Sequence, residues 1–376
     1  MEPASSSVMV CLISRQTMQN LLPILQYRPQ QVVCITTREE DNSRKHLETI
    51  LHAQQIPADT PLYVDAYAPD TTLHACRQLI TRYGADRLVA NLTGGTKVMS
   101  LAAFRAFSAA HVPCIYTDTP HRCILYLHPD DHAAEPLQTT VDVLTYLQAH
   151  GQHASLRGRE SRHTAPELAA FIGQHIADLD PFLGRLRYEM RDTPERTRLL
   201  FTPEGKQRRH VAAELLVLAM RSGLLEARPA GGSNVEITFR DGKARRYLEG
   251  EWLEDLVFDA VQTAGFDSCA TNVALAWQDA QDREMNEIDV AVVHNLGFFY
   301  ISCKTGSDSQ QMKQHLFELE TLAAMAGGLF NHPILVASSL KAIPVHLRRR
   351  MDTLGIAYVG PADLPRLVSR LKEIIR

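Results

Sequence analysis

The chain has 376 residues, of which 45% are hydrophobic and 22% charged, and its formal net charge is −4. A chain of this length and apolar content can bury two ordinary cores, so two domains with a connector are expected. The near-neutral balance argues against a globally basic nucleic-acid coat protein, although it is compatible with a local basic groove.

The seven cysteines are scattered, form no CxxC pair, and in several cases stand inside apolar runs. Such cysteines are typical of a reducing compartment rather than of a disulfide framework. The first residues lack the basic and apolar segments of a signal peptide, and no apolar run is long enough to span a bilayer. We therefore expect a soluble, cytoplasmic protein with no membrane partner.

The first 147 residues alternate strand and helix signals. Strands are expected at 8–13, 32–36, 62–64, 88–90, 114–116 and 123–127, and helices at 16–26, 39–55, 72–83 and 98–110. This alternation predicts a Rossmann-like α/β domain, 1–147, with a parallel sheet covered on both faces. Ligands of such sheets bind at the carboxyl ends of the strands.

A connector is expected over residues 148–248. It opens with a polar linker and continues with helices at 165–177 and 211–222 and a β-hairpin formed by 235–239 and 244–248. A helix next to a hairpin is typical of a winged-helix-like module. We favour a structural hinge over a module that reads base sequence.

The remaining residues, 249–376, predict a second α/β domain. Helices are expected at 252–262, 310–325 and 364–374, and strands at 269–277, 287–294, 298–303 and 334–337.

A glycine-containing loop follows the fourth strand of the first domain. Its glycines let the backbone approach a ligand, Thr96 is a candidate N-cap, and Lys97 adds positive charge at a helix N-terminus that favours anions. The spacing fits neither a Walker A loop nor a GxGxxG fingerprint. The candidate ligand-binding residues of this loop are Asn91, Thr93, Gly94, Gly95, Thr96 and Lys97.

Polar residues also follow three other strands of this domain. Together with the glycine-containing loop they are expected to surround one crevice with hydroxyls, an amide and cations, which suits a phosphodiester ligand. These further candidates are Ser14, Arg15, Gln16, Thr37, Thr117 and Asp118.

Residues 8–130 resemble the CARF domain, the CRISPR-associated Rossmann-like sensor of cyclic oligoadenylates. The resemblance rests on Ser14-Arg15-Gln16 and on the segment from Asn91 to Lys97. It implies a two-fold homodimer with the cyclic ligand on its axis, and an isologous dimer suits a symmetric ring. Cyclic tetra-adenylate is the family's commonest ligand and hence the expected one.

Charged residues in the second domain predict a second site. Strand alternation puts Glu287 and Asp289 on one face, and Ser302 and Lys304 on one face of the next strand, so Asp289 and Lys304 can converge. Glu254, on the preceding helix, supplies another carboxylate. Phosphodiester hydrolysis needs oxygen ligands for a divalent cation and a lysine that stabilises the growing charge on phosphate.

Residues 250–340 resemble the PD-(D/E)XK restriction-endonuclease-like core. The resemblance implies that Asp289, Glu254 and the backbone carbonyl of Cys303 bind Mn²⁺ or Mg²⁺, with Glu287 as a further candidate. Lys304 matches the catalytic lysine. Ser302 stands where the family has an acid, and its hydroxyl is a weaker metal ligand than a carboxylate.

Four basic clusters, at 185–187, 208–209, 243–246 and 348–350, would bind phosphate if they line the nuclease cleft. The alternative for each cluster is an ordinary solvent-exposed surface with no binding role.

The whole chain resembles the CARF–PD-(D/E)XK effector nucleases of type III CRISPR defence. The resemblance implies a metal-dependent endonuclease, activated by a cyclic oligoadenylate, that cleaves DNA, RNA or both with little sequence preference. Two alternatives remain open at this point. One is a ligand-sensing regulator that binds nucleic acid without cutting it, and the other is an enzyme that degrades the cyclic ligand itself.

Overall fold

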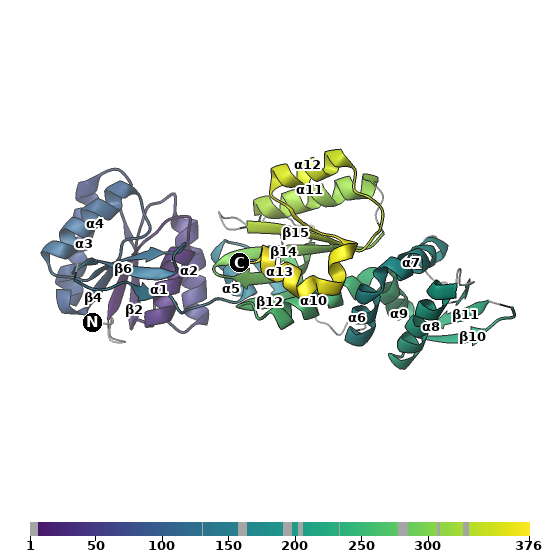
Figure 1. The fold of residues 1–376 in the computed structure, drawn as a ribbon. Coiled ribbons are helices and arrows are strands. Elements are labelled where there is room, and N and C mark those ends of the chain that lie inside the picture. Colours follow the sequence, from purple (N-terminus) through teal and green to yellow (C-terminus); the bar gives the residue numbers. More distant parts are fainter. Residues whose placement is uncertain are drawn as a thin grey trace. The chain divides into compact units, whose positions relative to one another are not determined.

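The computed structural model describes residues 7–129, 131–156, 164–190, 198–201, 206–232, 234–276, 285–306, 309–325 and 331–376. The chain forms two compact units that divide between Ala154 and Ser155 (Figure 1). Within the described residues, no helix combines the length and the apolar character needed to cross a membrane. All seven cysteines are free. The three-part division at 147/148 and 248/249 stays a prediction.

The first unit is built on a seven-stranded sheet of order β3-β2-β1-β4-β5-β6-β7. The first five strands in this order, β3, β2, β1, β4 and β5, are parallel, and β6 and β7 add an antiparallel edge. The chain order therefore reverses between β1 and β4, which is the switch point of a Rossmann-like sheet. The strands are β1 (Val8–Leu12), β2 (Gln31–Thr36), β3 (Leu62–Tyr63), β4 (Leu88–Asn91), β5 (Cys114–Asp118), β6 (Cys123–His128) and β7 (Glu135–Pro136).

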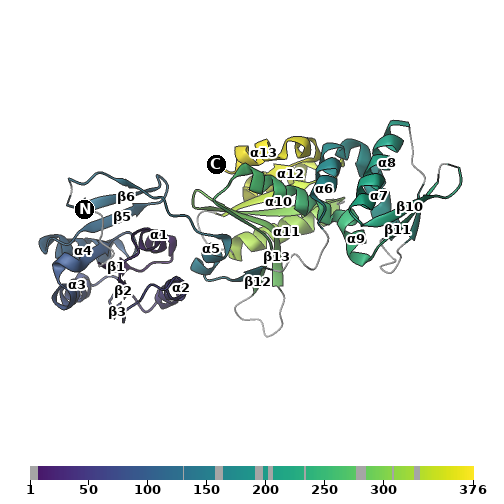
Figure 2. The ribbon, with the colours of Figure 1, turned by 90° about the horizontal axis from the view of Figure 1, so that it is seen from below.

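Helices cover both faces of this sheet, α3 and α4 on one side and α1, α2 and α5 on the other (Figure 2). The central strands are buried along their length because both faces are covered, as the apolar run of β1 requires. The Rossmann-like prediction is thus confirmed. The helices are α1 (Met18–Tyr27), α2 (Asp41–Ala53), α3 (Pro69–Tyr83), the 3₁₀ turn η1 (Ala85–Arg87), α4 (Lys97–Ala109) and α5 (Val143–Ala149).

The second unit begins with the connector. Its strands form a three-stranded antiparallel sheet of order β10-β11-β9, beside three helices. The elements are α6 (Pro166–Gln174), α7 (Ile176–Met190), β9 (Arg198–Phe201), α8 (Lys206–Arg221), β10 (Leu225–Pro229) and β11 (Val235–Phe239). Of the predicted linker, residues 157–163 lie outside the described part of the chain.

The predicted hairpin of 235–239 with 244–248 is wrong. Strand β11 pairs with the preceding β10, and the chain turns between them through Gly231 and Gly232, both at positive φ. Residues after β11 are helical, as α9 (Gly242–Arg246) and the π-helix η3 (Tyr247–Glu251). The Asp241 side chain accepts the Ala244 N–H at 2.8 Å and caps this helix. The Asp-Gly pair, which favours a hairpin turn, therefore starts a helix here.

The rest of the second unit is a six-stranded sheet of order β16-β15-β14-β13-β12-β8. Strands β12, β13 and β14 are antiparallel, whereas β14, β15 and β16 are parallel. The strands are β8 (His153–Leu156), within which the division between the units falls, β12 (Ser268–Ala276), β13 (Met285–His294), β14 (Gly297–Lys304), β15 (Asn331–Ala337) and β16 (Ala357–Val359).

Helices α10 and α13 cover one face of this sheet, and α11 and α12 the other (Figure 1). Helix α12 was not predicted because the charged residues Arg348, Arg349, Arg350 and Asp352 separate its few apolar positions. The helices are α10 (Trp252–Ala264), α11 (Ser309–Met325), α12 (Val345–Leu354), the 3₁₀ turn η4 (Pro361–Arg366) and α13 (Leu367–Ile374).

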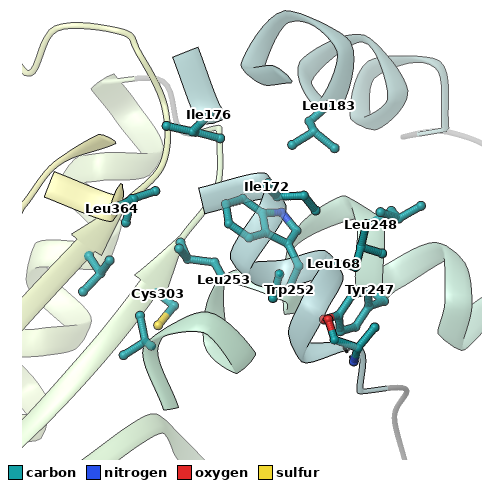
Figure 3. Close-up of a cluster of buried hydrophobic side chains, with 14 of the residues drawn as sticks. Leu168, Ile172, Ile176, Leu183, Tyr247, Leu248, Trp252, Leu253, Cys303 and Leu364 are labelled. Atoms are coloured by element: carbon teal, nitrogen blue, oxygen red, sulfur yellow. Dashed lines mark hydrogen bonds between the residues drawn. The ribbon is translucent and has the colours of Figure 1, made fainter. Parts of the chain in front are cut away.

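One apolar core joins the connector to this sheet. Trp252 and Leu253 of α10 lie among Leu168 and Ile172 of α6, and Cys303 of β14 reaches the same cluster (Figure 3). Both α10 residues are fully buried. Burial of this apolar surface makes the connector and the sheet one cooperative body.

The Leu253→Ala substitution should lower the free energy of unfolding of the second unit by about 2–5 kcal/mol, because it opens a cavity in this shared core. Urea unfolding followed by tryptophan fluorescence measures it, since both tryptophans belong to this unit's sequence. The matched control is Leu340→Ala, at a leucine that is 48% exposed. Equal stability of the two variants would contradict the shared core.

Candidate functional site

The first candidate site lies at the switch point of the first unit. A cavity of about 1140 Å³ opens there, between the loops that follow β1, β2, β3 and β4. It collects seven of the predicted ligand-binding residues, namely Ser14, Arg15, Gln16, Thr37, Thr93, Gly95 and Thr96.

The loop after β4 is packed tightly against β1. A Cβ atom on Gly94 would lie 2.0 Å from the carbonyl oxygen of Leu12, so only glycine fits. Gly95 adopts a φ of +72°, which also favours glycine. Thr96 caps α4, as predicted, by accepting the Met99 N–H at 3.2 Å.

The other predicted residues do not line the cavity. Asn91 is fully buried and donates to the side-chain oxygen of Asn20 at 3.0 Å, while its own oxygen accepts the Thr93 N–H. The N–H of buried Thr117 donates to Thr93 Oγ1 at 2.7 Å. Asn91 and Thr117 therefore hold the loop in place from beneath.

Three further predicted residues lie away from the cavity lining. Gly94 is buried against β1, Lys97 is exposed, and the Asp118 carboxylate pairs with His121 Nδ1 at 2.8 Å. The imidazole of His121 lowers the pKa of that carboxyl.

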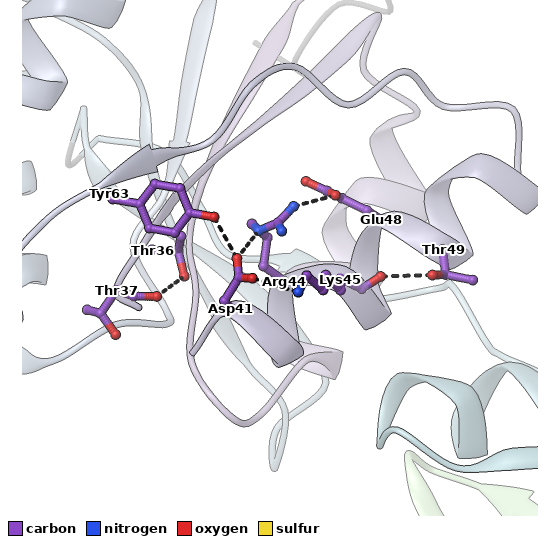
Figure 4. Close-up of polar contacts among 8 residues, drawn as sticks. All are labelled: Thr36, Thr37, Asp41, Arg44, Lys45, Glu48, Thr49 and Tyr63. Atoms are coloured by element: carbon purple, nitrogen blue, oxygen red, sulfur yellow. Dashed lines mark hydrogen bonds and ion pairs between the residues drawn. The ribbon is translucent and has the colours of Figure 1, made fainter. Parts of the chain in front are cut away.

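The cavity wall also contains aromatic residues that the sequence analysis missed. Tyr63, in β3, and Tyr67, after it, both line the cavity; Tyr67 is largely exposed and Tyr63 about half exposed. The Tyr63 hydroxyl donates to Asp41 at 2.7 Å, an acceptor that Arg44 and Lys45 of α2 share (Figure 4). The Arg44 guanidinium holds the pKa of Asp41 well below its usual range.

Exposed rings beside hydroxyls and Arg15 can stack on bases while polar groups bind phosphate. The sequence signal that could have predicted this aromatic wall is the presence of two tyrosines within five residues at a strand end.

The second candidate site lies where β13 and β14 separate. Their paired positions run from His294–Gly297 to Val290–Ile301 and stop there, although both strands continue. Beyond that point, in the part of the chain that the structure describes, β13 pairs with β12 and β14 pairs with β15. Asn272, in β12 beside this point, adopts a φ of +55°, and its position is skipped in the register. Such irregularities in a sheet redirect side chains near functional sites.

Asp289 stands at this fork. Its Oδ2 accepts the backbone N–H of Cys303 at 2.7 Å and the hydroxyl of Ser302 at 3.5 Å, and Lys304 Nζ lies 3.8 Å away. The predicted convergence of Asp289 and Lys304 is therefore present. Cys303 points into the core, whereas Ser302 and Lys304 are partly exposed, as strand alternation requires.

Two cavities meet at Lys304. The smaller one, about 170 Å³, is lined by Glu287, Asp289, Ser302 and Lys304 beneath helix α11. The larger one, about 960 Å³, is lined by Lys304 and by Glu254 on the other side of the sheet. The predicted residues thus form two groups that share the lysine.

The π-helix η3 places Glu254 at the larger cavity. A π-turn shifts the helix register by one residue and is frequent at functional sites. The carbonyl of Glu249 accepts the Thr305 hydroxyl at 3.0 Å, and Gly250 lies so close to Thr305 that a Cβ there would meet its oxygen at 2.8 Å. This contact ties the start of α10 to the strand end that carries Lys304.

The chemistry of these oxygens fits a hard divalent cation. Among the described residues, no three His, Cys, Asp or Glu side chains gather as a ready-made metal cage. Mg²⁺ and similar ions are often held by one or two carboxylates, with water and substrate phosphate completing the shell. The oxygen donors are of the type such an ion prefers, although they are divided between the two cavities: Asp289 lines the smaller one, and Glu254 and Cys303 line the larger one. Their chemistry is compatible with the predicted metal.

Fold and sites together define a two-unit α/β protein with a Rossmann-like ligand crevice and an endonuclease-like core. Two family models match the chain: the Card1 CARF domain at residues 8–146 and the Card1-like endonuclease domain at residues 241–376. The chain therefore contains a Card1 CARF domain and a Card1-like endonuclease domain, which together cover most of its length. No curated protein sequence matches it.

Solved structures share the fold. Protein VC1899 from Vibrio cholerae superposes with a TM-score of 0.82 at 21% identity, covering 98% of both chains. Can2 from Sulfobacillus thermosulfidooxidans, solved in complex with cyclic tetra-adenylate, gives 0.75 at 21% identity and covers 97% of this chain and 96% of its own. A type III CRISPR defence DNA nuclease activated by cyclic oligoadenylate gives 0.55 at 15% identity, covering 98% of this chain and 52% of its own.

The Gly94→Ala substitution should destabilise the first unit by about 1–3 kcal/mol, because the new methyl group overlaps the Leu12 carbonyl. The expected drop in the melting temperature of this unit is several degrees. Differential scanning calorimetry measures it, with Lys97→Ala, at an exposed position near the same loop, as the control. An unchanged melting temperature for Gly94→Ala would contradict the packing of the loop on β1.

Proposed function

We propose that this protein is a metal-dependent endonuclease that a cyclic oligoadenylate switches on. The observation that carries the proposal is the Asp289–Lys304 pair at the fork of β13 and β14, in an endonuclease-family domain attached to a CARF domain. DNA, RNA or both are the proposed substrates, cleaved with little sequence preference in type III CRISPR defence.

The proposed activator is cyclic tetra-adenylate. The switch-point cavity supports this choice, because it combines hydroxyls and Arg15 for phosphates with Tyr63 and Tyr67 for adenine rings. The structural likeness to Can2, which was solved with that ligand, points the same way. A homodimer is proposed with it, because a symmetric ring offers the same groups to two protomers.

In the proposed reaction, Asp289, the Cys303 carbonyl and Glu254 would hold Mn²⁺ or Mg²⁺. When bound, such an ion polarises the phosphoryl group and lowers the pKa of a water molecule. Lys304, whose ammonium group lies 3.8 Å from Asp289 Oδ2, would stabilise the negative charge that grows on phosphate. The Cys303 N–H holds the Asp289 carboxylate in place and so limits its reorganisation.

Activation requires that the ligand bind the active form more tightly than the inactive form, and this difference in affinity limits the activation. The rival interpretations, a non-cleaving regulator and an enzyme that degrades the cyclic ligand, differ from this proposal in one result. If either rival is correct, the protein should show no nucleic-acid cleavage that depends on Lys304.

The Lys304→Ala substitution should lower the rate of nucleic-acid cleavage at least about 10²-fold, the usual cost of one charge-stabilising group. The measurement uses supercoiled plasmid, single-stranded DNA and single-stranded RNA with Mn²⁺, with and without cyclic tetra-adenylate. The matched control is Lys372→Ala, at an exposed lysine of α13 that lines neither cavity.

Binding of cyclic tetra-adenylate is measured on the same samples. Ligand-dependent cleavage that persists in Lys304→Ala would exclude this site. Tight ligand binding by the wild type without cleavage of any substrate would favour the regulator.

The Ser302→Glu substitution should lower the metal concentration that gives half-maximal cleavage, because it restores a carboxylate beside Asp289 in the smaller cavity. We expect a shift of about tenfold, on the scale of a neighbouring-ligand change at metal sites. Titration of Mn²⁺ and Mg²⁺ against cleavage rate measures it, with Ser302→Ala as the control. An unchanged titration in both variants would mean that position 302 is remote from the metal.

A further inference from the structure

Helix α7 of the connector forms one wall of the larger cavity at Lys304. Arg187 and Tyr188 of this helix line it, opposite Lys304 and Glu254. The family model for the endonuclease domain starts at residue 241, so this helix lies outside it. The basic cluster at 185–187 thus reaches the cleft through one of its two arginines.

Contacts at both ends of α7 fix this wall to the endonuclease core. Asp180 accepts the backbone N–H of Leu340 at 3.2 Å, in the loop after β15. Arg187 packs on Gly306, where a Cβ atom would lie 2.7 Å from its Nε and Nη2. Gly306 follows Lys304 by two residues, and consecutive Cα atoms are about 3.8 Å apart. The guanidinium of Arg187 therefore lies near the strand end that carries the catalytic lysine.

Arg187 has hydrogen-bonding capacity that the protein does not use. Its contact with Asp180 is long, at 3.5 Å, and within the described part of the chain its buried Nη1 has no hydrogen-bond partner. Burial lowers the pKa of Arg187. A partly buried cation with donors to spare is stabilised by a further anion, and a planar guanidinium suits phosphate.

Tyr188 supplies a different kind of contact. It is 77% exposed although it lines the cavity, so its ring is free for contact with another molecule. Aromatic rings beside cations at a nucleic-acid groove stack on bases, which tolerates any sequence.

We infer that α7 is the substrate-binding wall of the nuclease cleft, on which Arg187 holds a phosphate of the nucleic acid and Tyr188 stacks on a base. The inference rests on the proposed nuclease function. It makes the connector part of the cleft and assigns it two positioning residues.

The test is binding of a fluorescent 20-nucleotide single-stranded DNA to the full-length protein in EDTA, over a series of salt concentrations. Arg187→Ala should reduce the slope of log K against log salt by about 0.7, the loss of one phosphate contact. Tyr188→Ala should weaken binding by about 5- to 150-fold with the slope unchanged, and Tyr188→Phe should restore the affinity.

Arg185→Ala is the matched control, because Arg185 lies on the same helix but does not line the cavity. Tyr188 is exposed, so its variants remain informative if Arg187→Ala folds poorly. Wild-type affinity for Tyr188→Ala, together with equal salt slopes for the two arginine variants, would overturn the inference.

Cleavage assays on the same proteins distinguish failure of the proposed nuclease function from failure of the inference about α7. With Mn²⁺ and cyclic tetra-adenylate, Tyr188→Ala should raise KM and leave kcat within about twofold, as expected when binding is lost equally from ground and transition states. A wild type that binds DNA through α7 but never cleaves would refute the proposed function alone. Normal cleavage and binding by both α7 variants would refute this inference alone.

Discussion

The site of the second unit depends on one hydrogen bond, from the Cys303 N–H to Asp289 Oδ2. Pairing between β13 and β14 ends at Val290 and Ile301, so a carboxylate replaces the next backbone acceptor. This places a charged side chain inside a sheet, and Lys304 lies close enough to offset the charge. The fork thus leaves Asp289 and Lys304 side by side at the cavity where we propose that a cation and a phosphate bind.

A comparable constraint governs the first unit. The reversal of strand order between β1 and β4 opens a crevice, and the contact of Gly94 with the Leu12 carbonyl fixes its floor. The amide and hydroxyl groups of Asn20, Asn91, Thr93 and Thr117 then link β1, β4 and β5 beneath the loop. Buried polar chains of this kind are rigid when every member is paired, and they hold the exposed residues in position.

Much of this was predictable from local sequence. The alternating β and α signals gave the Rossmann-like sheet, and strand alternation gave the approach of Asp289 to Lys304. Local patterns could not show that Asn91 and Thr117 face the core. A polar residue at a strand end gives the same sequence pattern whether its side chain lines the cavity or is buried beneath the loop. The hairpin prediction failed because Tyr247 and Leu248, which suit a strand, are buried on a helix that Asp241 caps. Helix α7 at the cleft depends on contacts between residues far apart in the chain, such as Arg187 with Gly306.

The most direct test of the central claim is a joint titration of the full-length protein with cyclic tetra-adenylate. Ligand occupancy and the single-turnover cleavage rate of a labelled oligonucleotide are measured on one sample with Mn²⁺. We expect the cleavage rate to rise in proportion to occupancy and to disappear in EDTA while the ligand stays bound. A cleavage rate that is independent of occupancy, or that survives removal of the metal, would contradict it.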